Sequence, residues 1–374
     1  MDVGRDPSGL EAYTARDASW MMADVAASRD LMRAVRLYGP GDVRVESIPR
    51  PPVEEGEQVR LRMRSVGICG SDLHHYREGS TGDEENAEPF VLGHEISAEV
   101  PPESADRLGL EAGTVVAVDP AHPCGECEWC GRGHHNLCPN VEFKGVVGHQ
   151  GGLAEFITVH PHQVVSVPDD VGPDTAALLE PLGVAIHALD LAEIELMDTV
   201  AVLGAGPIGL LCAQVAQAAG AGTCYVIDPL DYRADVAADL GADAVAARRA
   251  PIDEWTSGRG VDVVIEATNA PEGFEHAVES VRIGGKVVLV GIPEGNEHTL
   301  TASTARRKGV TVQWSRRMGS VYLRALRMVQ DGRVAVDPLV THRFPLKEGP
   351  EALALQSRYD DGIIKAVVYQ EAVS

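Results

Sequence analysis

The 374-residue sequence has few lysines, few aromatic residues and no long apolar run. Only five lysines occur, aromatic residues make up 5%, and acidic residues outnumber basic ones by 56 to 32. A surface this acidic repels nucleic acid phosphates and anionic membranes. This acidic composition is typical of proteins adapted to high salt, and it is equally typical of ordinary proteins encoded by a GC-rich genome. No stretch reaches the roughly 18 apolar residues of a membrane span, so we expect a soluble, cytoplasmic protein that binds neither nucleic acid nor membrane.

Cysteine is also scarce, but four of the seven cysteines fall in one short run. The run C-G-E-C-E-W-C-G-R-G-H-H-N-L-C contains Cys124, Cys127, Cys130 and Cys138. The chain shows no secretion signal, so a disulfide framework is a poor explanation for this cluster. Four thiolates at such spacing can close a tetrahedral cage around a structural zinc ion. The same lobe carries Glu126 and Glu128, which argues against a nucleic-acid-binding zinc module.

The composition changes along the chain in a way that predicts two domains. Residues 1–31 mix charges with small residues and lack the basic flank of a secretion signal, so we expect either a disordered extension or an overlong start there. Short β-branched runs punctuated by Gly and Pro predict a strand-rich domain over 32–181. Within 182–315, apolar strands alternate with Ala-rich helical stretches, which predicts a doubly wound parallel sheet. We expect 316–374 to complete the first domain.

The run G-A-G-P-I-G lies between a predicted strand and a predicted helix, the context in which it indicates a dinucleotide site. Gly204 permits a tight turn, Gly206 lets backbone amides approach a pyrophosphate, and Gly209 lets the helix pack on the strand. Asp228 closes the next strand, where a carboxylate can bind the ribose hydroxyls and repel the extra phosphate of NADP. The pattern therefore favours a dinucleotide-binding site over an ordinary Gly-rich turn, and the cofactor we expect is NAD. The candidate cofactor residues are Gly204, Gly206, Pro207, Ile208, Gly209, Asp228 and Arg233. Arg233 fits a solvated helix position equally well.

Three separated segments supply a thiol, an imidazole and a carboxylate. They are Cys69 in V-G-I-C-G-S-D, His94 in L-G-H-E and Glu180 in L-L-E-P-L. A catalytic zinc ion needs such an incomplete protein shell, which leaves a position for water or substrate. Taken singly, each residue has a commoner explanation as a buried cysteine, a core histidine or a solvated glutamate. Sequence spacing alone does not show that the three converge.

Together, these motifs resemble the zinc-dependent medium-chain alcohol dehydrogenases in order and interval from Met32 to Tyr369. Glu180 in the third zinc position, with C-G-S-D-L-H-H-Y, resembles the polyol branch, which includes sorbitol, xylitol and L-idonate dehydrogenases. The resemblance implies an α/β fold with a GroES-like, β-rich catalytic domain and a Rossmann nucleotide-binding domain. It also implies two zinc ions per chain, one catalytic and one structural, and hydride transfer from a secondary alcohol of a polyol to NAD.

The resemblance implies a route for the alcohol proton. Ser71 takes the hydroxyl proton, and His74 passes it on through the nicotinamide ribose, a role suited to a side chain that titrates near neutral pH. The alternative for His74 is a polar histidine hydrogen-bonded near the cleft. Asp72 is expected to orient His94 as a carboxylate behind the zinc ligand. The alternative for Asp72 is a helix cap.

Other roles stay open in the sequence. In the polyol branch Glu95 can itself approach zinc while Glu180 holds the zinc-bound water, so the ligand assignment between the two glutamates is not settled. His75 stands near the position of a substrate-facing tyrosine and is a substrate candidate. Arg316 matches an arginine that holds hydroxylated substrates, although Arg317 beside it can serve as well, and either can be a surface arginine.

Alternative functions share parts of this pattern. L-threonine 3-dehydrogenase and 2,3-butanediol dehydrogenase carry the same zinc residues and cofactor fold, and they differ in the charge that their pockets must recognise. A non-catalytic zinc and nucleotide-binding protein is the interpretation from another class, and the intact set of Cys69, His94 and Glu180 argues against it. Apolar strands of the nucleotide-binding domain, such as K-V-V-L-V-G and V-T-V-Q-W, can continue a sheet across a dimer interface, as they do in members of this family. We therefore expect a homodimer or homotetramer.

Overall fold

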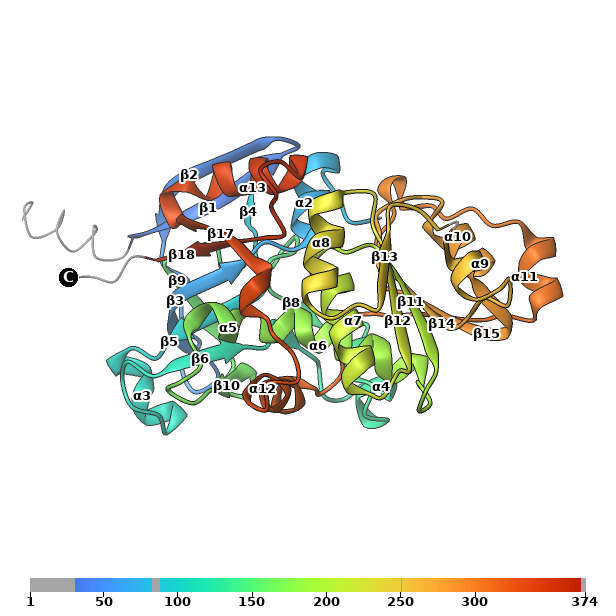
Figure 1. Cartoon of the computed structure of the whole chain (residues 1–374). Helices are drawn as coiled ribbons and strands as arrows, with labels where there is room; N and C mark the ends of the chain where they lie inside the picture. Colours follow the sequence, from blue (N-terminus) through green and yellow to red (C-terminus); the bar gives the residue numbers. More distant parts are fainter. Residues whose placement is uncertain (1–30, 83–87, 250, 371–374) are drawn as a thin grey trace, which may run out of the picture.

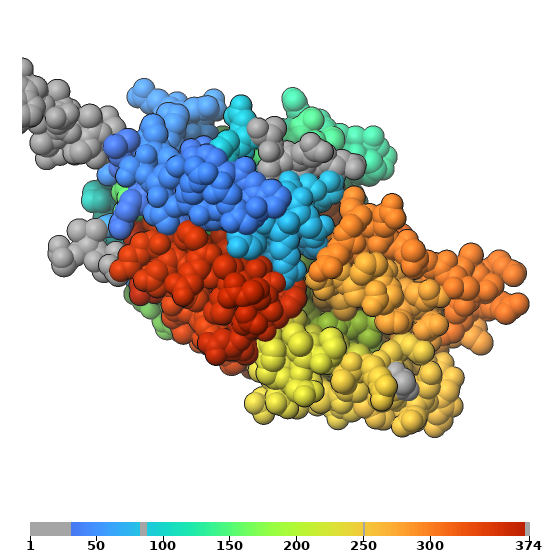
Figure 2. Space-filling view, turned by 90° about the horizontal axis from the view of Figure 1, so that it is seen from above, coloured from blue at the N-terminus to red at the C-terminus, as the bar shows by residue number. Residues whose placement is uncertain are grey.

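The computed structural model describes residues 31–82, 88–249 and 251–370 (Figure 1). The expected extension over residues 1–31 lies outside the described residues except for Leu31, which is the first residue of strand β1. The chain forms two units that lie beside each other in Figure 1, a β-rich unit and a parallel-sheet unit. The C-terminal residues lie side by side with the N-terminal strands on the face seen in Figure 2.

A mixed sheet forms the centre of the β-rich unit. Its order is β10-β6-β5-β3-β18-β17, with β9 also paired to β3. In β3 buried Val, Leu and Met alternate with half-buried Arg, the period-two pattern of a strand with one face in a core. Strand β18 pairs antiparallel with β3, so the end of the chain completes this sheet. The strands are β3 (Val59–Gly67), β5 (Glu95–Glu99), β6 (Val115–Val118), β9 (Phe156–Val159), β10 (Val164–Ser166), β17 (Val340–Pro345) and β18 (Lys365–Tyr369).

Smaller elements surround this sheet. Strands β1 (Leu31–Gly39), β2 (Asp42–Pro49) and β4 (Phe90–Val91) form a second sheet, and β7 (Ala121–His122) pairs with β8 (Glu142–Phe143). The helices of this unit are α2 (Gly70–Glu78), α3 (Pro102–Leu108), α4 (Glu128–Gly131), α5 (Pro173–Ala177) and α13 (Gly349–Arg358). Short 3₁₀ helices occur at η1 (His135–Leu137), η2 (Pro161–Gln163), η3 (Glu294–Asn296), η4 (Asp337–Leu339) and η5 (Leu346–Glu348).

The second unit is the predicted doubly wound parallel sheet. All neighbouring strands pair in parallel in the order β13-β12-β11-β14-β15-β16, which places the reversal of strand order beside β11. The strands are β11 (Thr199–Leu203), β12 (Thr223–Ile227), β13 (Ala244–Ala246), β14 (Val261–Glu266), β15 (Val281–Leu289) and β16 (Thr311–Trp314). The helices are α6 (Leu179–Ala192), α7 (Pro207–Ala218), α8 (Asp231–Asp239), α9 (Pro251–Trp255), α10 (Gly273–Ser280), α11 (Ala302–Lys308) and α12 (Tyr322–Gln330).

A shared apolar core fixes the two units against each other. One buried cluster runs from Ala117 and Val367 in the mixed sheet to Val200 and Val263 in the parallel sheet. Its central element is the run Pro173–Ala192, which is long and apolar enough to cross a bilayer by composition. However, 72% of its most apolar window is buried inside the protein, where α6 packs against α7 and α12. This run is therefore used as a core helix.

Candidate active site

A cavity of about 830 Å³ is lined by residues of both units, and it brings together most of the side chains singled out in the sequence. The β-rich unit contributes Cys69, Ser71, His74 and His94. The parallel-sheet unit contributes the Gly-rich turn after β11 and the end of β12. This volume is in the range of sites for small ligands and cofactors, and a junction between domains is a common place for them.

Cys69 is the N-cap of α2, directly after β3 has ended. Its backbone N–H donates to Asp72 Oδ2 at 2.9 Å, so the aspartate closes the first turn of the helix. The other oxygen of Asp72 accepts a hydrogen bond from the Gly93 N–H at 3.2 Å. Asp72 therefore caps helix α2, as one of the two expectations had it. Because its two oxygens accept hydrogen bonds from the N–H groups of Cys69 and Gly93, the buried carboxylate also holds the chain at Cys69 next to the chain at His94.

His94 follows Gly93, whose φ of +92° is open to glycine at little energetic cost. The imidazole Nδ1 lies 3.7 Å from Asp72 Oδ1, close but beyond hydrogen-bond distance, and has no hydrogen-bond partner among the described residues. Burial lowers the pKa of His94, but the negative charges of Asp72, Cys69 and Glu180 outweigh it and raise that pKa well above its usual value. The same concentration of negative charge favours a bound cation.

The two candidate glutamates have different surroundings. Both oxygens of Glu95 accept hydrogen bonds from Lys365 Nζ, at 2.7 and 2.8 Å, in a pair with exposed side-chain fractions of only 0% and 2%. Glu180, in the first turn of α6, is 4% exposed and lines the cavity without a salt bridge in the described part of the chain. Burial raises the pKa of Glu180 to about 8, while the charge of His94 lowers it. In this arrangement Glu180 is the carboxylate that is not already neutralised by lysine.

The donor types in the cavity fit a catalytic zinc ion, namely one thiol, one imidazole with an unsatisfied buried nitrogen and one carboxylate. Their contacts are looser than those of the cysteine lobe. Within residues 31–82, 88–249 and 251–370, only the lobe cysteines bring three or more ligand atoms within 4.8 Å of one another.

The lobe itself has the geometry of a preformed metal cage. Its four ligating thiols belong to Cys124, Cys127, Cys130 and Cys138. Sγ of Cys138 lies 3.5 Å from that of Cys124 and 3.8 Å from that of Cys127. Hydrogen bonds from the backbone N–H groups of Glu126 and Cys127 lower the pKa of the Cys124 thiol to about 6. A thiolate is the ligand form that zinc requires, so these residues fit a structural zinc ion.

The residues of the expected proton route lie in α2. Ser71 and His74 line the cavity. His74 Nδ1 lies 2.7 Å from Glu78 Oε1, and Nε2 lies 3.1 Å from the Ile292 carbonyl oxygen. Both partners are acceptors, so a neutral ring, with one N–H, can satisfy only one of them. His75, expected to face substrate, instead lies outside the cavity lining, where it is 1% exposed with its ring 5.3 Å from that of Phe90.

The Gly-rich turn has the shape that a pyrophosphate requires. Gly204 has φ +94°, and a Cβ there would lie 2.6 Å from the Ala267 carbonyl oxygen. A Cβ on Gly209 would overlap the carbonyl oxygen of Gly204, so only glycine allows α7 to pack this closely. At Gly206, the N-cap of α7, the nearest atom to a Cβ would be 3.7 Å away. That open side faces the cavity that also includes Pro207 and Ile208.

Asp228 lies at the end of β12, with 3% of its surface exposed. Its Oδ2 accepts a hydrogen bond from the Ala205 N–H at 2.7 Å and lies 3.7 Å from Arg233 Nη1, and its Oδ1 accepts from the Leu230 N–H at 2.9 Å. The carboxylate is therefore fixed against the Gly-rich turn. Arg233 is not solvated, because its guanidinium lies 4.5 Å from the ring centre of Tyr359 at the cavity wall.

Both arginines considered in the sequence line the cavity, whereas Thr268 and Ile292 were missed there. Arg316 and Arg317 both line the cavity, and the Arg317 guanidinium lies 4.4 Å from the ring centre of Phe143, which in turn is 5.4 Å from the His94 ring. Thr268 and Ile292 follow the ends of β14 and β15 and reach the same cavity. A lysine inside the apolar run I-I-K-A-V-V-Y was the available signal for the ion pair between Lys365 and Glu95.

Comparisons with known proteins agree with this arrangement. The family model described as "Alcohol dehydrogenase GroES-like domain" matches residues 55–169, and "Zinc-binding dehydrogenase" matches 207–331. Sorbitol dehydrogenase of Bacillus subtilis is 32% identical over 343 residues, covering 90% of this chain and 97% of the relative. Sorbitol dehydrogenase of Homo sapiens is 36% identical over 335 residues, covering 87% and 93%.

The solved structure of L-idonate 5-dehydrogenase from Escherichia coli aligns with a TM-score of 0.81 at 27% identity, covering 91% of this chain and 98% of that one. The predicted fold class, a GroES-like domain with a Rossmann domain, is confirmed. Such proteins are oxidoreductases that use zinc and a nicotinamide cofactor on small-molecule alcohols. This chain belongs to the zinc-dependent medium-chain dehydrogenases, in their polyol dehydrogenase branch.

Proposed function

We propose that the protein oxidises a secondary alcohol of a polyol to a ketone with NAD, at a zinc ion held by Cys69, His94 and Glu180. The observation that carries this proposal is the single cavity that joins these three side chains to the Gly-rich turn and Asp228. A non-catalytic zinc protein has no need to place a thiol, an imidazole and a carboxylate beside a dinucleotide turn.

When bound, zinc would polarise the alcohol oxygen, and the nicotinamide would accept the hydride. Ser71 and His74 both line the cavity, about one turn apart on α2. Ser71 would accept the alcohol's proton as it releases its own, and His74 would take up the released proton. The contact of His74 Nδ1 with Glu78 Oε1 at 2.7 Å holds the ring in place. Arg316 also lines the cavity and is the proposed donor of hydrogen bonds to substrate hydroxyls.

We assign the third ligand position to Glu180 and a supporting role to Glu95. Lys365 neutralises Glu95 through both carboxylate oxygens, so Glu95 would have to break a buried ion pair to reach the metal. Glu180 has no such competitor in the described residues and lines the cavity with Cys69 and His94. The buried pair then holds β18 against the segment that carries His94.

NAD is the proposed cofactor because a carboxylate at the end of the second strand, as Asp228 is here, would repel the extra ribose phosphate of NADP. A related chain from Sinorhizobium meliloti, 29% identical with a TM-score of 0.81 and covering 91% of this chain and 99% of that one, was solved with NADP. The fold therefore accepts either cofactor, and the local charge decides. Arg233 does not alter this assignment, because it lies 3.7 Å from Asp228 and is balanced by it.

The charges near the zinc position favour a polyol over threonine. L-threonine needs a carboxylate for its ammonium group, and the lining carboxylates are Glu180, Glu95 and Asp228. These are already used by the proposed zinc ion, by Lys365 and by the Gly-rich turn, respectively. A diol such as 2,3-butanediol satisfies fewer hydrogen bonds than a sugar alcohol. Sorbitol, xylitol, 2,3-butanediol, L-threonine and a simple secondary alcohol, each assayed with NAD and with NADP, separate these possibilities. Equal kcat/KM for 2-butanol and sorbitol would remove the polyol assignment.

The proposed assembly is a homodimer or homotetramer in the cytoplasm. Strand β16 is the edge of the parallel sheet, and its last residue, Trp314, is 61% exposed. An unprotected edge with an exposed aromatic residue can pair with a second copy of itself.

A further inference from the structure

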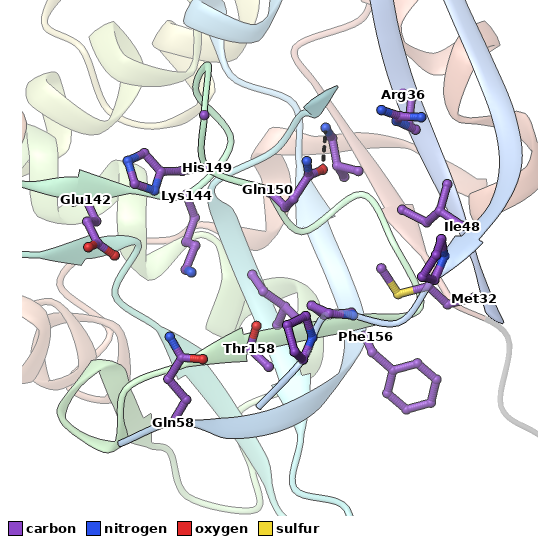
Figure 3. A pocket seen from close by; sticks show the side chains of 17 residues that line it. Met32, Arg36, Ile48, Gln58, Glu142, Lys144, His149, Gln150, Phe156 and Thr158 are labelled. Carbon is purple, nitrogen blue, oxygen red and sulfur yellow. Dashed lines mark hydrogen bonds between the residues drawn. The ribbon is translucent and has the colours of Figure 1, made fainter. Parts of the chain in front are cut away.

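A second cavity, of about 450 Å³, lies in the β-rich unit outside the lining of the active site (Figure 3). Its walls come from β1, β2, β9 and the segment 142–151. Polar groups gather at one side of the hollow in Figure 3, where Lys144, Gln58 and Thr158 are labelled, and Met32 and Ile48 lie at the other side. The cavity is therefore amphipathic along its length.

Lys144 supplies a cation that forms no ion pair with a described residue. Its Nζ makes no hydrogen bond and no ion pair with any described residue. Burial lowers the pKa of Lys144, and the exposed carboxylate of Glu142, two residues earlier in the chain, raises it without an ion pair. All the other lysines have oxygen acceptors: Lys286 contacts Glu193, Lys347 contacts Glu348, Lys365 contacts Glu95, and Lys308 donates to backbone carbonyls. In a chain of net charge −24, one half-buried lysine without an acceptor is a marked exception.

Two neutral donors face the same space as Lys144. Gln58 accepts a hydrogen bond from the Glu54 N–H at 3.4 Å through Oε1, which leaves its amide N–H₂ without a partner among the described residues. Thr158 is 8% exposed, and its hydroxyl forms no hydrogen bond within the described part of the chain. An ammonium, an amide and a hydroxyl that converge in a hollow complement a carboxylate, whose two oxygens accept several charge-assisted hydrogen bonds.

The rest of the lining is largely apolar or paired, and it also includes the exposed carboxylate of Glu142. Met32 and Ile157 are 4% and 3% exposed, and Ile48 closes the wall beside them. Arg36, the other cation of the lining, donates to Glu46 at 3.4 Å and to the Pro89 carbonyl oxygen at 2.7 Å. Lys144 is therefore the lining cation without an ion pair among the described residues, and Glu142 adds one carboxylate to the same lining.

We propose that this cavity binds a small organic carboxylate, with its charged group at Lys144, Gln58 and Thr158 and its apolar body against Met32, Ile48 and Ile157. The site shares a wall with the active site. Lys144 faces the second cavity, while its neighbour Phe143 lines the catalytic cavity next to His94. A ligand at Lys144 thus contacts the segment that borders the zinc position.

Isothermal titration of the zinc-loaded protein with sodium hexanoate tests the site without reference to activity. The wild-type protein is expected to bind one more equivalent of hexanoate than Lys144→Gln. The matched control Lys347→Gln removes an exposed lysine that pairs only with its neighbour Glu348, and it should bind like the wild type. Ile48→Trp keeps the charge but fills the apolar end, and it should weaken binding at least tenfold.

Two further probes separate the ligand classes. 1-Hexanol, which lacks the charge, should bind at least tenfold more weakly than hexanoate, and inorganic phosphate should not displace hexanoate. The proposal is overturned if Lys144→Gln binds hexanoate as the wild type does, or if Ile48→Trp leaves binding unchanged. Displacement by phosphate would equally overturn it, since the cavity would then be an inorganic anion site.

Discussion

Glu180 is the residue on which the proposed chemistry depends most directly. Its carboxylate is 4% exposed and lines the cavity with Cys69 and His94. Replacing it by Gln removes the anionic ligand at nearly constant volume. We expect Glu180→Gln to lower kcat/KM for the polyol by roughly 100-fold or more. Zinc content measured by mass spectrometry should fall from two ions per chain toward one.

The double variant Glu95→Gln with Lys365→Met is the control for that assignment. It removes the second glutamate together with its partner, so no buried charge is left unpaired. We expect this double variant to keep two zinc ions per chain. Loss of one zinc ion from it, with retention in Glu180→Gln, would make Glu95 the ligand instead.

The pair between Lys365 and Glu95 also predicts an effect on stability. Lys365→Met alone leaves the Glu95 carboxylate buried without a cation, which typically destabilises a protein by about 3–5 kcal/mol. The double variant should recover most of this loss, because an apolar side chain replaces the desolvated ammonium. Denaturant unfolding of the wild type, the single variant and the double variant measures both steps. A single variant as stable as the wild type would show that the pair contributes little.

Glu266, at the end of β14, gives the parallel sheet a pH-dependent stability. Its side chain is 0% exposed, Oε1 accepts a hydrogen bond from the Thr268 N–H at 2.8 Å, and burial raises the pKa of Glu266 to about 7. The folded state therefore holds the proton more tightly than the unfolded state, whose glutamate has a pKa of 4.5. This contribution to stability is complete below pH 4.5 and is lost as the pH rises through 7.

Glu266→Gln should remove the decrease in unfolding free energy that the wild type shows as the pH rises through 7, because glutamine does not titrate. The glutamine side-chain oxygen can still accept the hydrogen bond from Thr268. Relative to the wild type, we expect the variant to gain about 2 kcal/mol of unfolding free energy between pH 5 and pH 8. Denaturant midpoints at several pH values measure the difference. The exposed Glu254→Gln should show no such trend. Parallel pH profiles for the wild type and Glu266→Gln would contradict the raised pKa.

The cysteine lobe is tied to the substrate end of the cavity. Asn136, in η1 of the lobe, is 9% exposed and donates to the Arg316 carbonyl oxygen at 3.0 Å. Loss of the lobe metal should therefore loosen the segment of Arg316 without touching the zinc position between the units. For Cys127→Ser we expect one zinc ion per chain and a KM for the polyol that rises more than kcat falls. A kcat that falls alone would mean that the lobe acts on the chemical step.

The sequence was sufficient for the features that depend on local pattern. The Gly-rich turn, the alternation of strands and helices and the spacing of the lobe cysteines each follow from short segments, and the structure has all of them. Contacts between distant segments were less accessible. The pairing of Glu95 with Lys365 joins residues 270 positions apart, and the burial of His75 against Phe90 depends on the packing of β4. Neither contact leaves a local signal that fixes its partner.

The two units share one continuous apolar core, so the cavity between them is built on a rigid frame. The buried cluster crosses from the mixed sheet to the parallel sheet through α6, which also carries Glu180 in its first turn. A packed junction of this kind fixes the distance between the zinc residues and the dinucleotide turn. The protein can therefore position an alcohol and a nicotinamide without first ordering a mobile interface.

The exposed edge of the parallel sheet predicts how two copies associate. Strand β16 has a partner only on the side of β15, and Trp314 at its end is 61% exposed. A lysine at this position would place a charge on the edge and oppose pairing with a second copy. We expect Trp314→Lys to be monomeric by size-exclusion chromatography with light scattering. Leu323→Lys changes a residue that is 76% exposed on α12 and should stay oligomeric. Should Leu323→Lys dissociate while Trp314→Lys does not, the copies meet through α12 instead of the sheet edge.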